Sequence, residues 1–225
     1  MSIAYSTNGD MVTMTITGTY NTTTFAQTLS DNGFDGAVTT KLTIVGDDAN
    51  QASIWTDLQI LDDAFTNTKP DSIYINNITF KTITIDGYCI RTTDIKVFCT
   101  DVTINGYSGG EGRWTQTGGG AYRVQSANYG SGYNSSNPTH DNVTVMNCCR
   151  GLRPEDNIGA YFKNCKLIPD TGATYSVSDN GLYFAVSSGG GCNNCTFDSC
   201  IVNNVGQCAF QSIGSTNCKF INCTM

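Results

Sequence analysis

The chain has 225 residues and a formal net charge of −7, with 39% hydrophobic, 10% aromatic and only 14% charged residues. A chain this apolar is not of the disordered class, and an acidic balance without a basic cluster argues against nucleic acid as a partner. No apolar run approaches the length of a membrane span, and the first residues lack the pattern of a secretion signal. We therefore expect no membrane partner and no disulfide framework.

Residues 1–40 are expected to form an N-terminal cap or attachment region. Met11–Thr17 alternates apolar and polar residues for most of its length, which is typical of a half-buried strand. Thr22–Asn32 has the spacing of one short helix, with Gly33 as its stop. The open end of a stack of strands needs such a cover, because exposed strand edges recruit other chains.

From residue 41 onward, short strand patterns alternate with turns rich in glycine, asparagine and serine. Lys41–Gly46 and Ser53–Leu58 look like the first strands, and Ile73–Phe80 begins a regular series. A glycine followed by a half-apolar run then recurs at Gly120–Ser126, Gly181–Ser187 and Gly206–Ser212. The spacing leaves no room for helices between these runs, so we predict an all-β fold.

The last third of the chain repeats one six-residue pattern: a small or apolar residue, a polar one, a bulky apolar one, a variable one, a small polar one and a cysteine. Its copies are Val143–Cys148, Ala160–Cys165, Cys195–Cys200 and Cys218–Cys223, and two looser copies with tyrosine in the last position are Ile83–Tyr88 and Val102–Tyr107. The six copies start 17 to 41 residues apart, so the unit has about 20 residues and the long gaps hold either two turns or one turn with an insertion.

Strands this short cannot bury one face alone, whereas stacked turns form continuous parallel sheets around a shared core. The repeat therefore predicts a parallel β-helix over residues 41–225. It also predicts one inner column of stacked side chains, made of Val145, Phe162, Phe197 and Phe220.

Four of the 11 cysteines end a repeat: Cys148, Cys165, Cys200 and Cys223. At the same position of successive turns they would lie about 4.8 Å apart with parallel side chains, whereas a disulfide needs Cβ atoms about 3.8 Å apart and turned toward each other. We predict a ladder of reduced, buried, metal-free thiols. The alternative is a zinc site from Cys192, Cys195 and Cys200, which lacks a second closely spaced cysteine pair.

Residues 107–142 depart from the pattern, and the segments Tyr107–Gly120 and Ala127–Asn142 are predicted to bulge from one turn as surface insertions. This segment is rich in glycine, serine and asparagine and carries Trp114, Tyr129 and Tyr133. Aromatic side chains on such loops suit glycan stacking or a subunit contact. The alternative is an ordinary long loop whose aromatic side chains fold back on the turn.

The sequence identifies no catalytic residue and no cofactor. The only histidine, His140, falls in the predicted insertion and is interpreted as a solvated loop residue. Lys163 and Asp198 share one outward position of the repeat, but Met146 and Ile221 occupy it in the other copies. Other carboxylate pairs are Asp86 with Asp101, Glu111 with Asp141, and Glu155 with Asp156. Since none recurs as a cluster, enzyme activity stays open, with a polysaccharide hydrolase or lyase as the class to test.

On its repeats and its asparagine, glycine and serine turns, the chain resembles the pectate-lyase-like right-handed β-helices, and among them the trimeric β-helix proteins of bacteriophage virions. The resemblance implies a non-enzymatic structural protein that decorates or cements the capsid exterior as a homotrimer, bound to the major capsid protein or other virion proteins. It would belong to the virion, which is assembled in the host cytoplasm. The alternative is a tailspike or tail fibre that binds or depolymerises host surface polysaccharide.

An ice-binding solenoid is a third class, but its regular threonine array would be interrupted at Tyr161 and Lys219. The final repeat, Cys218–Cys223, ends without a polar capping segment. We expect another copy or another protein to cover it, and outward apolar residues such as Met146 and Ile221 to be buried in the trimer. The acidic part, net −6 over residues 1–100, is expected to lie against a complementary surface.

Overall fold

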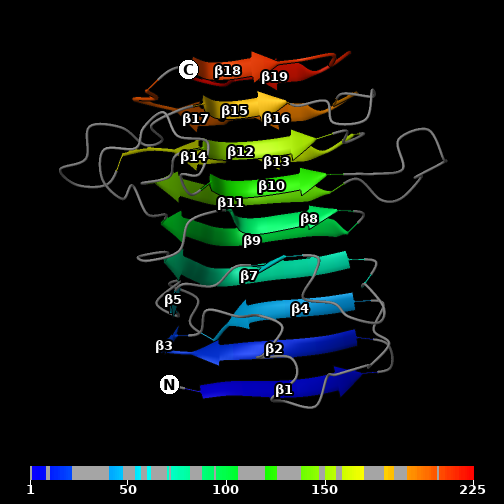
Figure 1. The fold of residues 1–225 in the computed structure, drawn as a ribbon, viewed down its shortest axis with the longest axis vertical. Coiled ribbons are helices and arrows are strands. Elements are labelled where there is room, and N and C mark those ends of the chain that lie inside the picture. The colour runs from blue at the N-terminus through cyan, green and yellow to red at the C-terminus, as the bar shows by residue number, and fades with distance from the viewer. Residues whose placement is uncertain are drawn as a thin grey trace.

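The fold is all-β, and most of its strands pair in parallel (Figure 1). The structure is a computed structural model that describes residues 2–8, 11–21, 41–47, 54–56, 60–61, 70, 72–81, 88–93, 95–105, 120–125, 138–146, 150–155, 159–169, 180–184, 192–206 and 208–225. Within these ranges every regular element is a strand, so the predicted fold class is confirmed at this level.

The strands follow one another along the chain with short or long connections. In order they are β1 (Ser2–Asn8), β2 (Met11–Thr17), β3 (Thr19–Asn21), β4 (Lys41–Gly46), β5 (Ile54–Thr56), β6 (Ile60–Leu61), β7 (Ser72–Lys81), β8 (Tyr88–Thr93), β9 (Lys96–Asn105), β10 (Gly120–Gln125), β11 (Thr139–Met146), β12 (Arg150–Glu155), β13 (Tyr161–Lys163), β14 (Lys166–Leu167), β15 (Asn180–Phe184), β16 (Thr196–Asp198), β17 (Ile201–Val202), β18 (Cys208–Ser212) and β19 (Lys219–Ile221).

The described strands form two sheets between which the chain alternates. The larger sheet has the order β1-β2-β4-β7-β9-β11-β13-β16-β19, with β3, β5, β14 and β17 beside this path. The second sheet has the order β6-β8-β10-β12-β15-β18. Successive strands of each sheet therefore stack as levels from the N-terminal end of the molecule to the C-terminal end (Figure 1). The predicted strands at residues 120, 181 and 206 correspond to β10, β15 and β18 of the second sheet.

The N-terminal end differs from the rest of the stack in one pairing. β1 is antiparallel to β2, whereas β2 is already parallel to β4. Parallel pairing thus begins at Met11, inside the region that the sequence assigns to a cap, and β1 is the strand that ends the sheet. The short helix predicted over Thr22–Asn32 lies outside the described residues.

One column of side chains runs through the whole inner face of the larger sheet. Strand pairing places eight residues at the same position of successive levels: Met14, Ile44, Ile75, Cys99, His140, Phe162, Phe197 and Phe220. All except the last are buried. The rings of Phe162 and Phe197 stack 4.6 Å apart and 1° from parallel, and Phe220 follows at 5.2 Å. Inward and outward residues alternate along each strand, so this column fixes which side chains face outward.

A second column consists of residues with left-handed backbone. Asn77, Asp101, Asn142, Asn164, Ser199 and Asn222 all have φ between 52° and 55°. The pairing on either side places them at one position of successive levels. Asparagine and aspartate adopt this conformation more readily than most residues, which explains the turn composition. The positive φ breaks the alternation, so apolar residues point inward on both sides of it.

This bend shows that part of the predicted register is wrong. Val145 pairs with Leu167, and the residue that pairs with Phe162 is His140. The six-residue pattern predicts Val145 beside Phe162, which is five residues out of register in this level, because the segments on both sides of Asn142 have alternating inward and outward residues. The predicted stacking of Phe162, Phe197 and Phe220 is confirmed.

The end of the predicted insertion changes. β10 (Gly120–Gln125) lies where a strand was expected between the two inserted segments, but β11 already begins at Thr139. Residues 139–142 therefore belong to the larger sheet. The gap of 41 residues between Cys99 and His140 holds one turn, because β9 pairs directly with β11.

Two glycines let the second sheet approach the larger one. A Cβ atom on Gly151 would meet the carbonyl oxygen of Gly181, and it would lie 2.5 Å from Cδ2 of Leu167 in β14. A Cβ atom on Gly181 would lie 2.9 Å from Cγ1 of Val202 in β17. Glycine at these positions is therefore required by packing between the sheets.

Gly151→Ala should lower the free energy of unfolding by about 1–3 kcal/mol, the usual cost of an added group in a filled core. Urea unfolding followed by circular dichroism measures the change. Gln211→Ala, at an exposed position of the same sheet, is the control and should change stability by less than about 0.5 kcal/mol. Equal stabilities of the two variants would mean that the sheets separate readily at Gly151.

Candidate functional site

Polar and charged side chains gather on the outward face of β11, β13 and β16. Asp141 pairs with Lys163, and Lys163 pairs with Asp198, so the three lie in one outward column at successive levels. The sequence predicts Met146 at this position, but strand pairing puts Asp141 there, and Met146 pairs with Asn105 beyond the bend. The predicted pair of Lys163 and Asp198 thereby becomes a group of two carboxylates around one ammonium.

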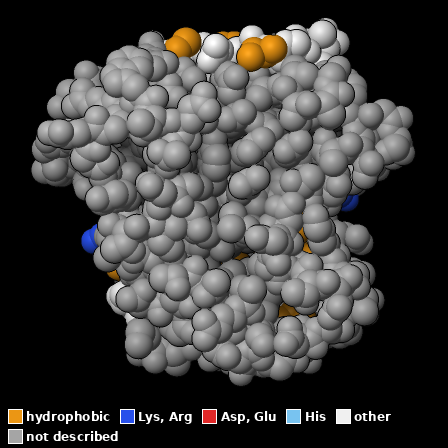
Figure 2. Space-filling model, viewed as in Figure 1, with side chains coloured by type: hydrophobic (Ala, Val, Ile, Leu, Met, Phe, Trp, Pro, Cys, Tyr) orange, Lys and Arg blue, Asp and Glu red, His pale blue; other side chains and the backbone are white. Residues whose placement is uncertain are grey.

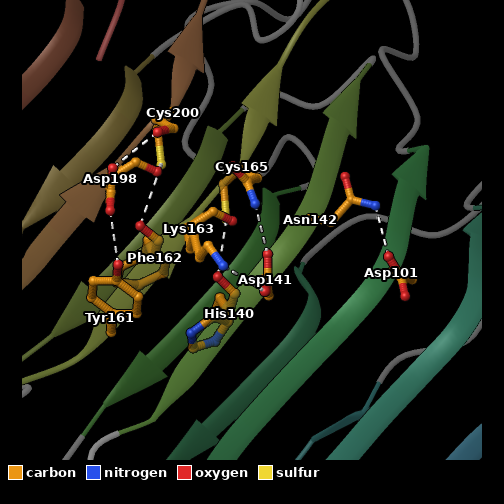
Figure 3. Close-up of polar contacts among 12 residues, drawn as sticks. Asp101, His140, Asp141, Asn142, Tyr161, Phe162, Lys163, Cys165, Asp198 and Cys200 are labelled. Atoms are coloured by element: carbon orange, nitrogen blue, oxygen red, sulfur yellow. Dashed lines mark hydrogen bonds and ion pairs between the residues drawn. The ribbon is translucent and has the colours of Figure 1, made fainter. Parts of the chain in front are cut away.

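Tyr161 adds an aromatic hydroxyl to this group. Its Oη atom donates a hydrogen bond to Oδ2 of Asp198 at 2.9 Å (Figure 3). Oγ of Ser199 donates to Oδ1 of the same carboxylate at 2.9 Å. The bond to Asp198 raises the pKa of Tyr161. The phenol therefore stays protonated, and it acts as a donor at neutral pH.

Asp141 is held in a similar way from the next level. Nζ of Lys163 lies 3.7 Å from Oδ2 of Asp141 (Figure 3). Nδ2 of Asn164 donates a hydrogen bond to Oδ1 of Asp141 at 3.1 Å. The side chains of Lys163 and Asp141 are 46% and 36% exposed, so this ion pair remains open to a ligand and to water. An exposed pair of this kind contributes little to stability, typically less than about 1 kcal/mol.

We call Asp141, Tyr161, Lys163 and Asp198 the outer polar site. Asp141 and Asp198 are two levels apart, which corresponds to about 9–10 Å along the sheet at a strand spacing of 4.7–4.9 Å. This strand spacing is at the upper limit of the about 6.5–9.5 Å that separates the two carboxyl groups of an inverting glycosidase, so we do not assign the pair a catalytic role. The site can instead hold a polyhydroxylated ligand by several hydrogen bonds.

Neither a protein-family model, nor a curated protein, nor a solved structure matches this chain. The part of the chain that the structure describes contains no group of three histidine, cysteine or acidic residues that could hold a metal ion. No helix in the described ranges is long and apolar enough to cross a membrane.

The candidate residues of the predicted insertion, Trp114, Tyr129 and Tyr133, lie outside the described residues. So do Asp86, Glu111 and Asp156 of the predicted carboxylate pairs. Asp101 occupies the left-handed bend, where its Oδ1 atom accepts a hydrogen bond of 2.7 Å from Nδ2 of Asn142. Asp101 therefore has a structural role at the bend.

The sequence did not single out one outward aromatic pair. The rings of Tyr74 in β7 and Phe98 in β9 stack 4.7 Å apart and 10° from parallel. β9 pairs with β7 and with β11, the strand that holds Asp141. The strand alternation around Ile75 and Cys99 could have found them, because it places both outward. The chain therefore offers aromatic surface on the same face as the outer polar site.

His140 is buried and is not the solvated loop residue that the sequence suggests. It is 1% exposed and its ring stacks on Phe162 at 4.6 Å. Burial lowers the pKa of His140 to about 3, so the imidazole is neutral in the folded protein. The prediction is wrong because β11 begins at Thr139, three residues before the end of the predicted insertion.

Three of the four predicted ladder cysteines lie in one inner column. Strand pairing on either side aligns Cys165, Cys200 and Cys223, and each thiol donates a hydrogen bond of 3.5 Å to a carbonyl of the level before it: His140, Phe162 and Phe197 respectively. These thiols are free. Pairing puts Val143, not Cys148, next in this column, and Cys148 itself lies outside the described residues. The predicted register of β11 is therefore wrong by the same five residues in this column.

Cys192, Cys195 and Cys200, the zinc alternative, are not brought together as ligands. Cys195 stacks with Cys218 in another inner column, because Thr196 pairs with Lys219, and the thiol of Cys218 donates to the carbonyl of Cys192 at 3.3 Å. Cys200 belongs to the column of Cys165. The two cysteine columns therefore contribute small apolar side chains to the core.

Cys165 and Cys200 should resist alkylation in the folded protein and react fully after denaturation. Both are 1% exposed, so the reagent cannot reach either sulfur atom in the folded protein. Pulse labelling with iodoacetamide and mass spectrometry provide the measurement, with half-buried Cys223 as the faster-reacting comparison. One equivalent of zinc, or a disulfide between two of these three residues, would contradict the prediction.

Proposed function

We propose that the two sheets are walls of a right-handed parallel β-helix. Alternation of the chain between two stacks of parallel strands supports this architecture. The handedness follows from the strong preference of connections between parallel strands for a right-handed course. Residues 1–40 would cap its N-terminal end, with β1 closing the sheet.

We further propose that the protein is a non-enzymatic structural component of a bacteriophage virion, a homotrimer that decorates or cements the capsid exterior. The observation that carries this proposal is the unbroken inner column of eight residues from Met14 to Phe220. A continuously packed core of this kind gives a rigid body, which suits a structural protein on a particle surface. The acidic N-terminal part would contact the major capsid protein or another virion protein.

Exposed apolar side chains at the C-terminal end support association. Hydrophobic atoms gather at the top of Figure 2, and among the described residues the exposed large hydrophobic side chains are Ile201, Ile213, Phe220, Ile221 and Met225. Grouped apolar exposure of this kind is typical of an interaction surface.

Sedimentation equilibrium of the purified chain tests the oligomeric state, and quantitative mass spectrometry of virions that contain it tests the location. We expect a trimer and a copy number of the same order as the capsid subunits. A monomer in solution, or a few copies per particle, would contradict a capsid decoration protein.

The second candidate is a tailspike or tail fibre that binds or depolymerises host surface polysaccharide. The outer polar site favours it, because Asp141, Lys163 and Asp198 share one outward column. Incubation with purified bacterial polysaccharides, followed by reducing-end and unsaturated-product assays, tests cleavage. Release of oligosaccharides that Asp198→Asn abolishes would replace the structural proposal by this one.

A further inference from the structure

The groups of the outer polar site are fixed before any ligand arrives. Tyr161 and Ser199 hold the two oxygens of Asp198, and Asn164 and Lys163 hold the two oxygens of Asp141. All are carried by strands or by the bend that joins them, which are more rigid supports than loops. Side chains that are already ordered lose little conformational entropy on binding, so weak individual contacts can add up to useful affinity.

These groups also retain hydrogen-bonding capacity. A carboxylate has about four acceptor sites and an ammonium three donors, so a single partner on each oxygen leaves further positions open. Asp141 and Lys163 are 36% and 46% exposed. A ligand rich in hydroxyl groups can donate to Asp141 and Asp198 and accept from Lys163.

The charges of the site disfavour an anionic ligand. Lys163 is bracketed by Asp141 and Asp198 on the neighbouring levels, so an anion near its ammonium also meets two carboxylates. The four residues of the site, two aspartates, one lysine and an uncharged tyrosine, sum to −1. The site itself therefore does not attract a polyanion.

An uncharged ligand with both hydroxyl groups and an apolar face fits all of these features. Tyr161 is half-buried and its hydroxyl is tied to Asp198, which fixes one aromatic ring next to the polar groups. Aromatic rings of this kind combine an apolar body with a polar tip. The carbon–hydrogen face of a sugar can pack on the ring while its hydroxyl groups reach the two carboxylates.

We propose that Asp141, Tyr161, Lys163 and Asp198 bind an uncharged saccharide and reject uronate- or phosphate-containing ones. This inference deepens the polysaccharide-binding function proposed above and rests on it, but it requires neither cleavage nor a position on the virion. The ligand would run across β11, β13 and β16.

The test uses the full chain on a glycan array that carries neutral bacterial oligosaccharides and matched oligosaccharides containing uronate, sialate or phosphate. The best neutral ligand is then titrated by isothermal calorimetry. Tyr161→Ala and Asp198→Asn should each weaken binding at least about tenfold, corresponding to the loss of a ring contact or of hydrogen bonds to a charged group. Tyr161→Phe, which keeps the ring and loses only the bond to Asp198, should weaken it less than Tyr161→Ala.

Lys81→Ala is the control, since Lys81 is exposed beyond the bend of β7, and it should leave the affinity unchanged. Circular dichroism and thermal melting confirm that each variant is folded. Preferential binding of acidic glycans would overturn the inference while leaving a saccharide-binding protein in place. Binding of no glycan on the array would overturn both the inference and the polysaccharide-binding function.

Discussion

Replacement of Phe197 by alanine should lower the free energy of unfolding by about 3–5 kcal/mol. The side chain is fully buried, and aromatic rings lie on both sides of it, Phe162 at 4.6 Å and Phe220 at 5.2 Å. Removal of the ring leaves a cavity that neighbouring levels cannot close, because their separation is set by backbone hydrogen bonds. Urea unfolding, with midpoint and slope both reported, gives the change.

Phe220→Ala is the matched control for this experiment. Phe220 continues the same column on the last described level, but it is 38% exposed, so its truncation should cost clearly less. A loss below about 1 kcal/mol for Phe197→Ala would place it among surface substitutions and contradict the inner column.

Stability should fall as the pH drops from about 6.5 toward 3, owing to His140. Burial lowers the pKa of His140 from 6.5 to about 3. Between these values the unfolded chain binds a proton that the folded protein does not, so unfolding is favoured increasingly as the pH falls. The contribution of neutral His140 to the free energy of unfolding is complete above pH 6.5. At pH 3 this contribution is lower by roughly 4–5 kcal/mol.

The variant His140→Phe separates this effect from the titration of carboxylates. It retains a stacked ring, as in the two following levels of the column, and His140 is the only histidine of the chain. The difference in unfolding free energy between wild type and variant, measured from pH 7 to pH 4, should change steadily with pH. A constant difference would mean that His140 is not buried as a neutral group.

The strands themselves could largely be predicted from local patterns. Alternation identified β2, β4 and β7, and the glycine-led runs identified three strands of the second sheet. The stacked phenylalanines also followed directly from the repeat, since Phe162, Phe197 and Phe220 occupy equivalent places in three well-matched copies.

The error in the predicted register of β11 arose at the left-handed bend at Asn142. A residue with positive φ lets apolar side chains point inward on both of its sides, so one level carries two alternating segments that look alike in sequence. The repeat therefore predicts that Val143–Met146 pairs with the segment before Asn164, whereas its residues pair with Lys166 and Leu167, after Asn164. With the wrong register, the sequence predicts neither the burial of His140 nor the pairing of Asp141 with Lys163. Asn142 itself was the signal, because it continues the series of bend residues formed by Asn77, Asp101 and Asn164.

Direct pairing between successive strands makes the height of the stack independent of the number of residues in each connection. Equivalent inner residues lie 22 positions apart between His140 and Phe162 but 41 apart between Cys99 and His140, and both pairs are direct neighbours in the sheet. Each turn thus adds one strand spacing of about 4.8 Å, whatever the number of residues it uses. A peptide inserted into the connection between β9 and β11 should therefore leave the spacing of these two strands unchanged.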